Sequence, residues 1–192
     1  WFFLRGVLWD PSGGFWNARL ADAEYYAQPI RRRLAAQPPP VQRVKLAGAN
    51  AEAARALLRA SERLQRPALA DHAVRALDHV LATMWRDGHL YHVQRRGRLA
   101  VPDLPGDLLR VLVAGAEVQQ RRPSPERARR LARVADNAAA WLGERMAGGN
   151  GELATEMAGL AAAACGHRDR FPALPRGCRD WALRRLALTP EA

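Results

Sequence analysis

Two consecutive stretches with a helical repeat of apolar residues constrain the fold of this 192-residue chain most. In residues 50–65, small and apolar side chains recur on one face, and charged side chains lie mainly on the opposite face. A similar apolar stripe continues through residues 68–85, and Pro67 lies where the first turn of a helix tolerates proline. The two stretches therefore predict an antiparallel helical hairpin.

The rest of the chain predicts further helices and one extended break. The break covers residues 87–101, where apolar and polar residues alternate between two turn signals, as in a two-stranded ribbon. Ser124, Pro125 and Glu126 form a helix start signal. Helices are therefore expected from Pro105 to about 118, from Pro125 to Met146, over about 152–165 and over about 179–188.

We therefore expect an all-α fold, with the helical hairpins packed side by side as in an α/α toroid, and the extended ribbon as an insert. Hairpins begin near residues 50, 105 and 152, a spacing of about fifty residues that is too long for tetratricopeptide or ankyrin repeats. Three hairpins would make about half of an (α/α)6 barrel. The length suits a single domain, with a short helix and a proline-rich linker in residues 1–48 and the hairpins in residues 49–192.

The chain is strongly basic, with a net charge of +11 and a pI near 11.2. Lys45 is its one lysine, and the arginines are spread in short clusters along the whole sequence instead of being gathered in one arm. This spread favours a solvated arginine surface over a dedicated anion-binding face. Binding of nucleic acid or of an acidic protein is kept as the alternative function.

Neither a metal site nor a membrane segment is expected. Cys165 and Cys178 lack the spacing of a zinc site, and both a disulfide and two free thiols are left open for them. His72 and His79 share a helix face but lie too far apart to hold one metal ion. No apolar run approaches the roughly 20 residues of a membrane span, and no signal peptide opens the chain. We expect a soluble, cytoplasmic protein without a cofactor.

Several short motifs in the first half of the chain carry a family resemblance. They are Gly13-Gly14-Phe15-Trp16 through Tyr25-Tyr26, the Pro38-Pro39-Pro40 linker, the passage 44–58 with Asn50, and the turn Asp87-Gly88-His89-Leu90. Together they resemble the C-terminal part of YyaL-type proteins over roughly residues 6–145. That family joins an N-terminal thioredoxin-like domain to an (α/α)6 toroid similar to six-hairpin glycosidases and N-acylglucosamine 2-epimerases.

The resemblance implies binding or processing of a carbohydrate or another small molecule, and the departures from the family pattern leave catalytic activity open. Leu20 replaces an acid of the family's Asp-Ala-Asp cluster, and Ala49 stands where tryptophan usually precedes Asn50. Pro105-Gly106-Asp107-Leu108 replaces an Asp-Tyr-Ala signature and keeps Asp107. The thioredoxin Cys-x-x-Cys is missing. The chain begins at Trp1, so we expect a fragment of a longer protein, with a thioredoxin-like domain either upstream or absent.

Sugar-processing toroids place acids, histidines and aromatic rings at the inner rim, which selects the candidate site residues. The catalytic candidates are Asp22, Glu24 and Asp107, and the substrate-binding candidates are Trp16, Tyr25, Tyr26, Asn50, His89 and His92. Each has a structural alternative, as a helix cap, a core aromatic or an exposed loop histidine. The sequence has no nucleophile elbow and no phosphate-binding loop, which excludes those two classes of site.

Overall fold

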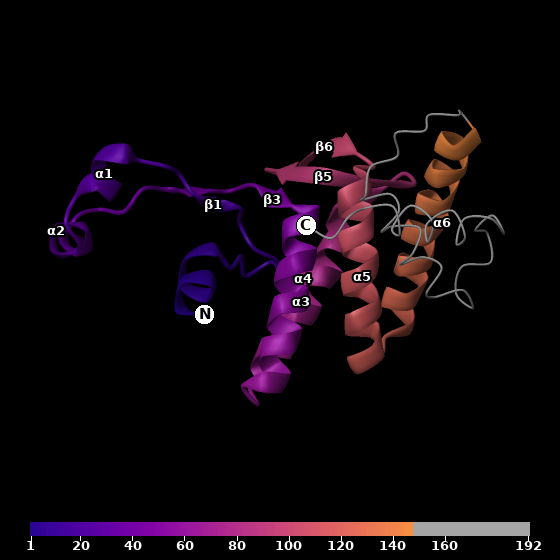
Figure 1. Cartoon of the computed structure of the whole chain (residues 1–192), viewed down its shortest axis with the longest axis horizontal. Coiled ribbons are helices and arrows are strands. Elements are labelled where there is room, and N and C mark those ends of the chain that lie inside the picture. Colours follow the sequence, from indigo (N-terminus) through magenta and orange to yellow (C-terminus); the bar gives the residue numbers. More distant parts are fainter. Residues whose placement is uncertain (148–192) are drawn as a thin grey trace, which may run out of the picture.

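The structure is a computed structural model that describes residues 1–147, and in this part four long helices pack beside a small antiparallel sheet (Figure 1). The helices are α3 (Ala47–Arg63), α4 (Pro67–Thr83), α5 (Pro105–Arg121) and α6 (Pro125–Ala147). The four helices predicted in this part are thus confirmed. The helices expected over about 152–165 and 179–188, and both cysteines, lie outside the described residues.

The apolar stripes of these helices form one continuous core. α3 and α4 are antiparallel and are joined by a short turn in which Gln65 has a positive φ of 50°. α3 also packs against α5, and α6 covers α5 and part of α4. The largest fully buried apolar side chains of the helices are Leu58, Leu77, Val80, Leu108, Val111, Val118 and Val134. Burial of this stripe is the main stabilising contribution for each helix.

A four-stranded antiparallel sheet lies across one end of the helices (Figure 1). Its longest strand, β5 (His89–Arg95), pairs with all the others: β3 (Lys45–Leu46), β4 (Trp85–Arg86) and β6 (Arg98–Pro102). Leu90 is fully buried and anchors β5 on the helices. The sheet therefore holds the beginning of α3 and the end of α4 at the same place.

The expected all-α class is wrong, because the fold is mixed. Besides the four-stranded sheet, β1 (Ala18–Arg19) and β2 (Val41–Gln42) form a separate two-stranded antiparallel ribbon. The β5–β6 ribbon was predicted, but only as an insert in a toroid-like helical array, and not as the centre of a sheet. The short strands were missed because two residues carry no periodic pattern, and their partners are distant in sequence, such as Gln94 for Lys45.

An arm projects away from the helices (Figure 1). It follows the N-terminal π-helical turn η1 (Leu4–Leu8) and the first strand of the ribbon, and it carries the short helices α1 (Ala23–Ala27) and α2 (Ile30–Ala35). Neither short helix has a buried residue. The position of α1 and α2 is consequently fixed by the β1–β2 ribbon and not by core packing.

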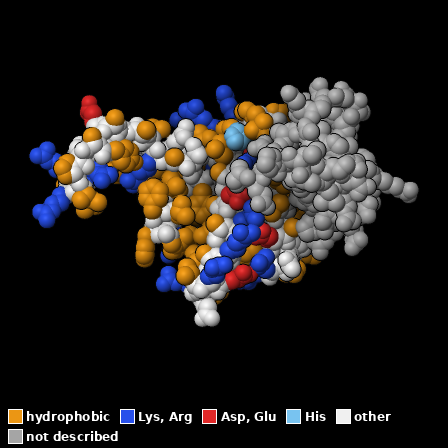
Figure 2. Space-filling view, viewed as in Figure 1, with side chains coloured by type: hydrophobic (Ala, Val, Ile, Leu, Met, Phe, Trp, Pro, Cys, Tyr) orange, Lys and Arg blue, Asp and Glu red, His pale blue; other side chains and the backbone are white. Residues whose placement is uncertain are grey.

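Many arginines on the helices are paired with acids. Glu117 on α5 accepts from Arg55 at 3.0 Å and from Arg59 at 2.8 Å, both on α3. Figure 2 shows acidic and basic side chains interleaved along the front of the helices. Hydrogen bonds from these arginines outweigh the effect of burial and lower the pKa of Glu117. None of the helices in residues 1–147 combines the length and the apolar character that a membrane span requires.

Candidate functional site

The glycine-aromatic motif is anchored by the side chain of Asn50. The Oδ1 atom of Asn50 accepts from the N–H of Phe15 at 2.6 Å, and its Nδ2 atom donates to the C=O of Phe15 at 3.1 Å. Nδ2 also donates to the C=O of Leu46 at 3.0 Å, and Asn50 is 2% exposed. A Cβ at Gly14, where φ is +77°, would lie 2.9 Å from Oδ1. Glycine at position 14 therefore permits the close approach.

The ammonium group of Lys45 is the centre of a second anchor for the same segment. It contacts Asp10 Oδ2 at 2.5 Å, the C=O of Gly13 at 2.6 Å and Nε2 of His79 at 3.0 Å. The ring of Trp16 lies 4.7 Å from Nζ, a cation-π distance. Nζ also lies 3.4 Å from Oγ of Ser12, so four partners share the three donors of the ammonium, and the side chain is only 3% exposed. This cluster holds the segment on α4 and leaves no donor for a ligand.

Burial and hydrogen bonds together shift the pKa values of this cluster. Burial lowers the pKa of Lys45, an effect that the carboxylate of Asp10 partly offsets. Burial and then the nearby charge of Lys45 lower the pKa of His79. His79 is therefore neutral at pH 7, and its Nε2 atom accepts from Lys45. For Asp10, burial is outweighed by hydrogen bonds from Lys45 and Ser12, and its pKa is lowered.

Among the candidate residues, His92 on β5 and Asp107 on α5 form the pair best arranged for acid-base chemistry. Nδ1 of His92 lies 2.6 Å from Oδ2 of Asp107, whose side chain is 5% exposed, whereas that of His92 is 30% exposed. Nε2 of His92 has no hydrogen-bond partner among the described residues. A carboxylate that holds Nδ1–H fixes the ring and leaves Nε2 as a base that solvent or a ligand can reach.

The first turns of α5 and α3 position the carboxylate of this pair. Asp107 is the third residue of α5, where the partial positive charge of the helix N-terminus favours a carboxylate. Gly48, in the first turn of α3, lies against it, and a Cβ at this position would overlap Oδ1 of Asp107. The absent side chain of Gly48 thus lets the two helices bring the carboxylate beneath His92.

A second histidine-aspartate pair lies nearby in sequence but in a different setting. Nδ1 of His89 contacts Oδ2 of Asp103, and Oδ1 of Asp103 accepts from the N–H of Leu90 at 3.0 Å. The side chain of His89 is 50% exposed, and Asp103 has a positive φ of 53°. The pair connects the beginning of β5 to the loop after β6. Its role is therefore explained by holding these two segments together.

Four further candidates, Asp22, Glu24, Tyr25 and Tyr26, lie on the arm, away from His92 and Asp107 (Figure 1). Asp22 caps α1 by accepting from the N–H of Tyr25 at 2.8 Å, and Glu24 is exposed in the first turn of that helix. Tyr25 donates its hydroxyl to the C=O of Arg33 at 3.2 Å and meets the ring of Tyr26 edge to face. The expected acidic and aromatic cluster is therefore divided, because Trp16 packs on Lys45 and the other four residues lie on the arm.

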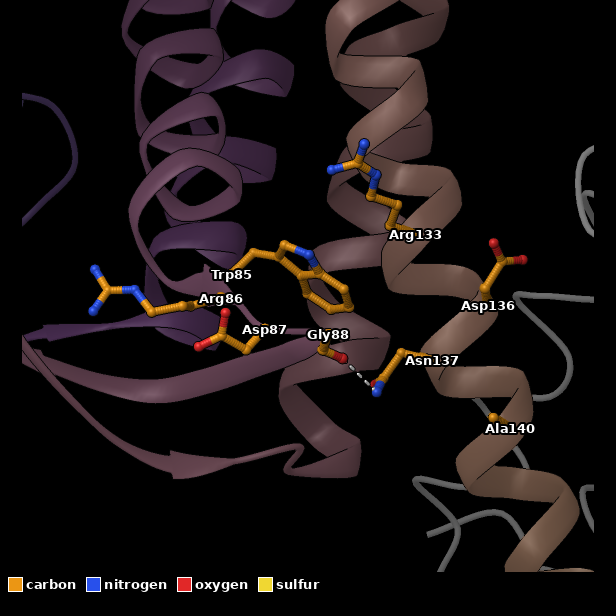
Figure 3. Close-up of a pocket in the computed structure, with 8 residues that line it drawn as sticks. All are labelled: Trp85, Arg86, Asp87, Gly88, Arg133, Asp136, Asn137 and Ala140. Carbon is orange, nitrogen blue, oxygen red and sulfur yellow. Dashed lines mark hydrogen bonds between the residues drawn. The ribbon is translucent and has the colours of Figure 1, made fainter.

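Sequence reasoning missed the buried polar cluster around Lys45. Asp10 and Lys45 were given no role, and His79 was weighed only as a metal ligand. The one signal was that Lys45 is the single lysine of a chain rich in arginine. A pocket between the β4–β5 turn and α6 was also missed, because Trp85 was assigned to the stripe of the preceding helix (Figure 3). Within residues 1–147, no group of three or more histidine, cysteine or acidic side chains could hold a metal ion.

Comparison with known proteins adds no family assignment to this geometry. No protein-family model matches the chain, and no curated protein sequence matches it either.

Proposed function

We propose that this chain belongs to a divergent relative of the YyaL-type proteins, and that it binds or processes a carbohydrate or a similar small polar molecule. The Asn50–Phe15 contact supports the resemblance. It joins two of the motifs that carry it, the Gly-Gly-aromatic segment and the asparagine of the first long helix, although they are 35 residues apart in sequence. Motifs that depend on one another in this way are expected to occur together.

In this proposal, His92 is the acid-base group and Asp107 orients it. The observation that carries the proposal is the 2.6 Å contact between Nδ1 of His92 and Oδ2 of Asp107, combined with an Nε2 atom that no described residue engages. A neutral imidazole held in this way can take a proton from a ligand hydroxyl and return it in a later step.

The test is binding and turnover of a panel of mono- and disaccharides by the 192-residue chain and three variants. His92→Ala and Asp107→Asn are expected to lower turnover by about 10²-fold or more, the usual contribution of a positioned acid-base group. His89→Ala is the matched control, because it removes the other histidine-aspartate pair, and it is expected to retain the wild-type rate. A wild type without binding to any sugar, or His92→Ala with the wild-type rate, contradicts the proposal.

One observation favours a second candidate function, binding of nucleic acid through the arm. Arg31, Arg32 and Arg33 are consecutive on α2, and none of them forms an ion pair within residues 1–147. An exposed basic helix on a projecting arm can follow a phosphate backbone. Retention of DNA or RNA at about 50 mM salt that falls steeply by about 200 mM, and is lost on replacing the three arginines by alanine, would support this function. No retention at the lower salt concentration rules it out.

A further inference from the structure

The end of the arm exposes two large apolar side chains. Ile30 and Leu34 of α2 are 64% and 82% exposed, and no residue of this helix is buried. Residues four positions apart lie on the same side of a helix, so Ile30 and Leu34 form one apolar face. Leaving such side chains in water forgoes the favourable burial of apolar surface. This face is therefore open to a partner that can cover it.

The same end of the arm is strongly basic. Arg31 and Arg33 flank the apolar face, because a helix has about 3.6 residues per turn, and Arg32 lies opposite. No acid occurs in the sequence between Glu24 and Glu52. None of these arginines forms an ion pair within residues 1–147, in contrast to the paired arginines of α3. Figure 2 shows hydrophobic side chains among basic ones at this end of the arm, which therefore carries a positive charge.

An anionic lipid bilayer is the partner that matches both properties. Its headgroups carry the negative charge that attracts arginines, and its acyl chains can cover aliphatic side chains. A nucleic acid matches only the arginines, because its phosphate backbone offers the apolar face nothing to pack against. A protein partner would need a groove shaped for this projecting end, whereas a fluid bilayer needs none (Figure 1). The apolar face thus favours a membrane surface.

We propose that the end of the arm binds the surface of a membrane that contains anionic lipids. Ile30 and Leu34 would enter the boundary between headgroups and acyl chains, and the flanking arginines would lie beside the lipid phosphate groups. The contact is peripheral, because the six residues of α2 are far fewer than the roughly 20 residues of a membrane span. Two apolar side chains and a few arginines give weak, reversible binding. The inference goes beyond the proposed sugar site and does not depend on it, since that site lies away from the arm (Figure 1).

The experiment is cosedimentation of the 192-residue chain with vesicles of phosphatidylcholine that contain about 30% phosphatidylserine, and with vesicles of pure phosphatidylcholine. Leu34→Ser is expected to weaken binding to the anionic vesicles by about ten-fold, and Arg31→Gln by about five-fold. Leu64→Ser and Arg129→Gln are the matched controls, because Leu64 is 61% exposed at the end of α3 and Arg129 is exposed on α6. Both controls are expected to bind like the wild type. All four positions are exposed, so each variant is expected to fold.

Three results overturn the inference. They are the absence of wild-type binding to the anionic vesicles at about 5 mM lipid, equal binding to both kinds of vesicle, and wild-type affinity in Leu34→Ser. A DNA duplex at the same salt concentration is the comparison for the other class of partner. Retention of the duplex without binding to vesicles would assign the arginines of α2 to nucleic acid and contradict the membrane contact. Weaker vesicle binding in Leu34→Ser, with unchanged binding in Leu64→Ser, supports the inference.

Discussion

Asn50 pairs through its side-chain amide with both backbone polar groups of Phe15, at 2.6 Å and 3.1 Å, as a neighbouring strand would. Phe15 lies in a segment that has no long strand partner, and both Phe15 and Asn50 are buried. Buried backbone groups need a hydrogen-bond partner. This relationship therefore determines how the first sixteen residues attach to α3.

Asn50→Ala is expected to destabilise the fold by about 2–4 kcal/mol, because it leaves the N–H and the C=O of Phe15 buried without a partner. The free energy of unfolding in urea is the measurement. Asn17→Ala is the control, since Asn17 is exposed and, among residues 1–147, its side chain bonds only Gln42, at 2.9 Å. The control should stay within about 0.5 kcal/mol of the wild type. Equal stability of both variants would show that Asn50 is not the anchor.

Gly48→Ala is expected to destabilise the protein by about 1–3 kcal/mol, because the added methyl group would overlap the carboxylate of Asp107 beneath His92. Gly6→Ala is a matched control, since a Cβ at Gly6 meets no atom within 4 Å. Thermal and urea unfolding measure both variants. A Gly48→Ala protein as stable as Gly6→Ala would mean that α3 and α5 are not in close contact at this place.

Stability is expected to fall as the pH decreases below about 6.5, because the pKa of His79 is lower in the folded chain than in the unfolded chain. The unfolded chain then binds more protons, so the contribution of neutral His79 is complete above the unfolded pKa and decreases below it. In the fold, His79 faces Lys45, Asp10, Gln94 and Thr83, and a charged imidazole would oppose the ammonium of Lys45.

The measurement is the free energy of unfolding at pH 7.5, 6.0 and 5.0 for the wild type and for His79→Gln. The variant should lose part of the dependence on pH in this interval. A further decrease below pH 3.8 is expected from Asp10, whose pKa is lowered in the fold. An identical slope in His79→Gln and the wild type between pH 7.5 and 5.0 would assign the effect to other groups.

Arg127→Ala is expected to destabilise the packing of α6 on α4 by about 1–3 kcal/mol. The guanidinium of Arg127 is 4% exposed, contacts both oxygens of Asp78 at 2.7 and 3.0 Å and donates to the C=O of Arg122 at 2.6 Å. The estimate is below that of a fully buried pair because Asp78 is partly exposed. Arg130→Ala, which removes an exposed pair with Glu126 on the same helix, should change the free energy of unfolding by less than about 0.5 kcal/mol. Equal effects of the two substitutions contradict this prediction.

The helices could be predicted from the sequence because each carries its own signals. Pro67, Pro105 and Pro125 occupy the first position of α4, α5 and α6, and the apolar stripes follow directly. The boundary of α4 was predicted two residues too late, since Trp85 fits the stripe but already belongs to β4. The sheet was not predictable in the same way, because its register depends on pairing between residues such as Lys45 and Gln94.

The sequence could name candidate residues but could not show how they are arranged. His92 and Asp107 were both candidates, but nothing in a sequence shows that residues 15 positions apart hydrogen-bond each other. Conversely, Trp16 and Tyr25 were expected in one cluster because they are near each other in sequence, and the β1–β2 ribbon separates them. Lys45 and His79 were missed because buried polar clusters have no periodic pattern.

The central claim is that His92, oriented by Asp107, contacts the small polar ligand. The most direct test is to follow the imidazole NMR signals of His92 and His89 while a sugar that binds the wild type is added. The account predicts that the His92 signals shift with the binding isotherm and the His89 signals do not, and that Asp107→Asn alters the His92 response. Saturating sugar that leaves the His92 signals unchanged would contradict it.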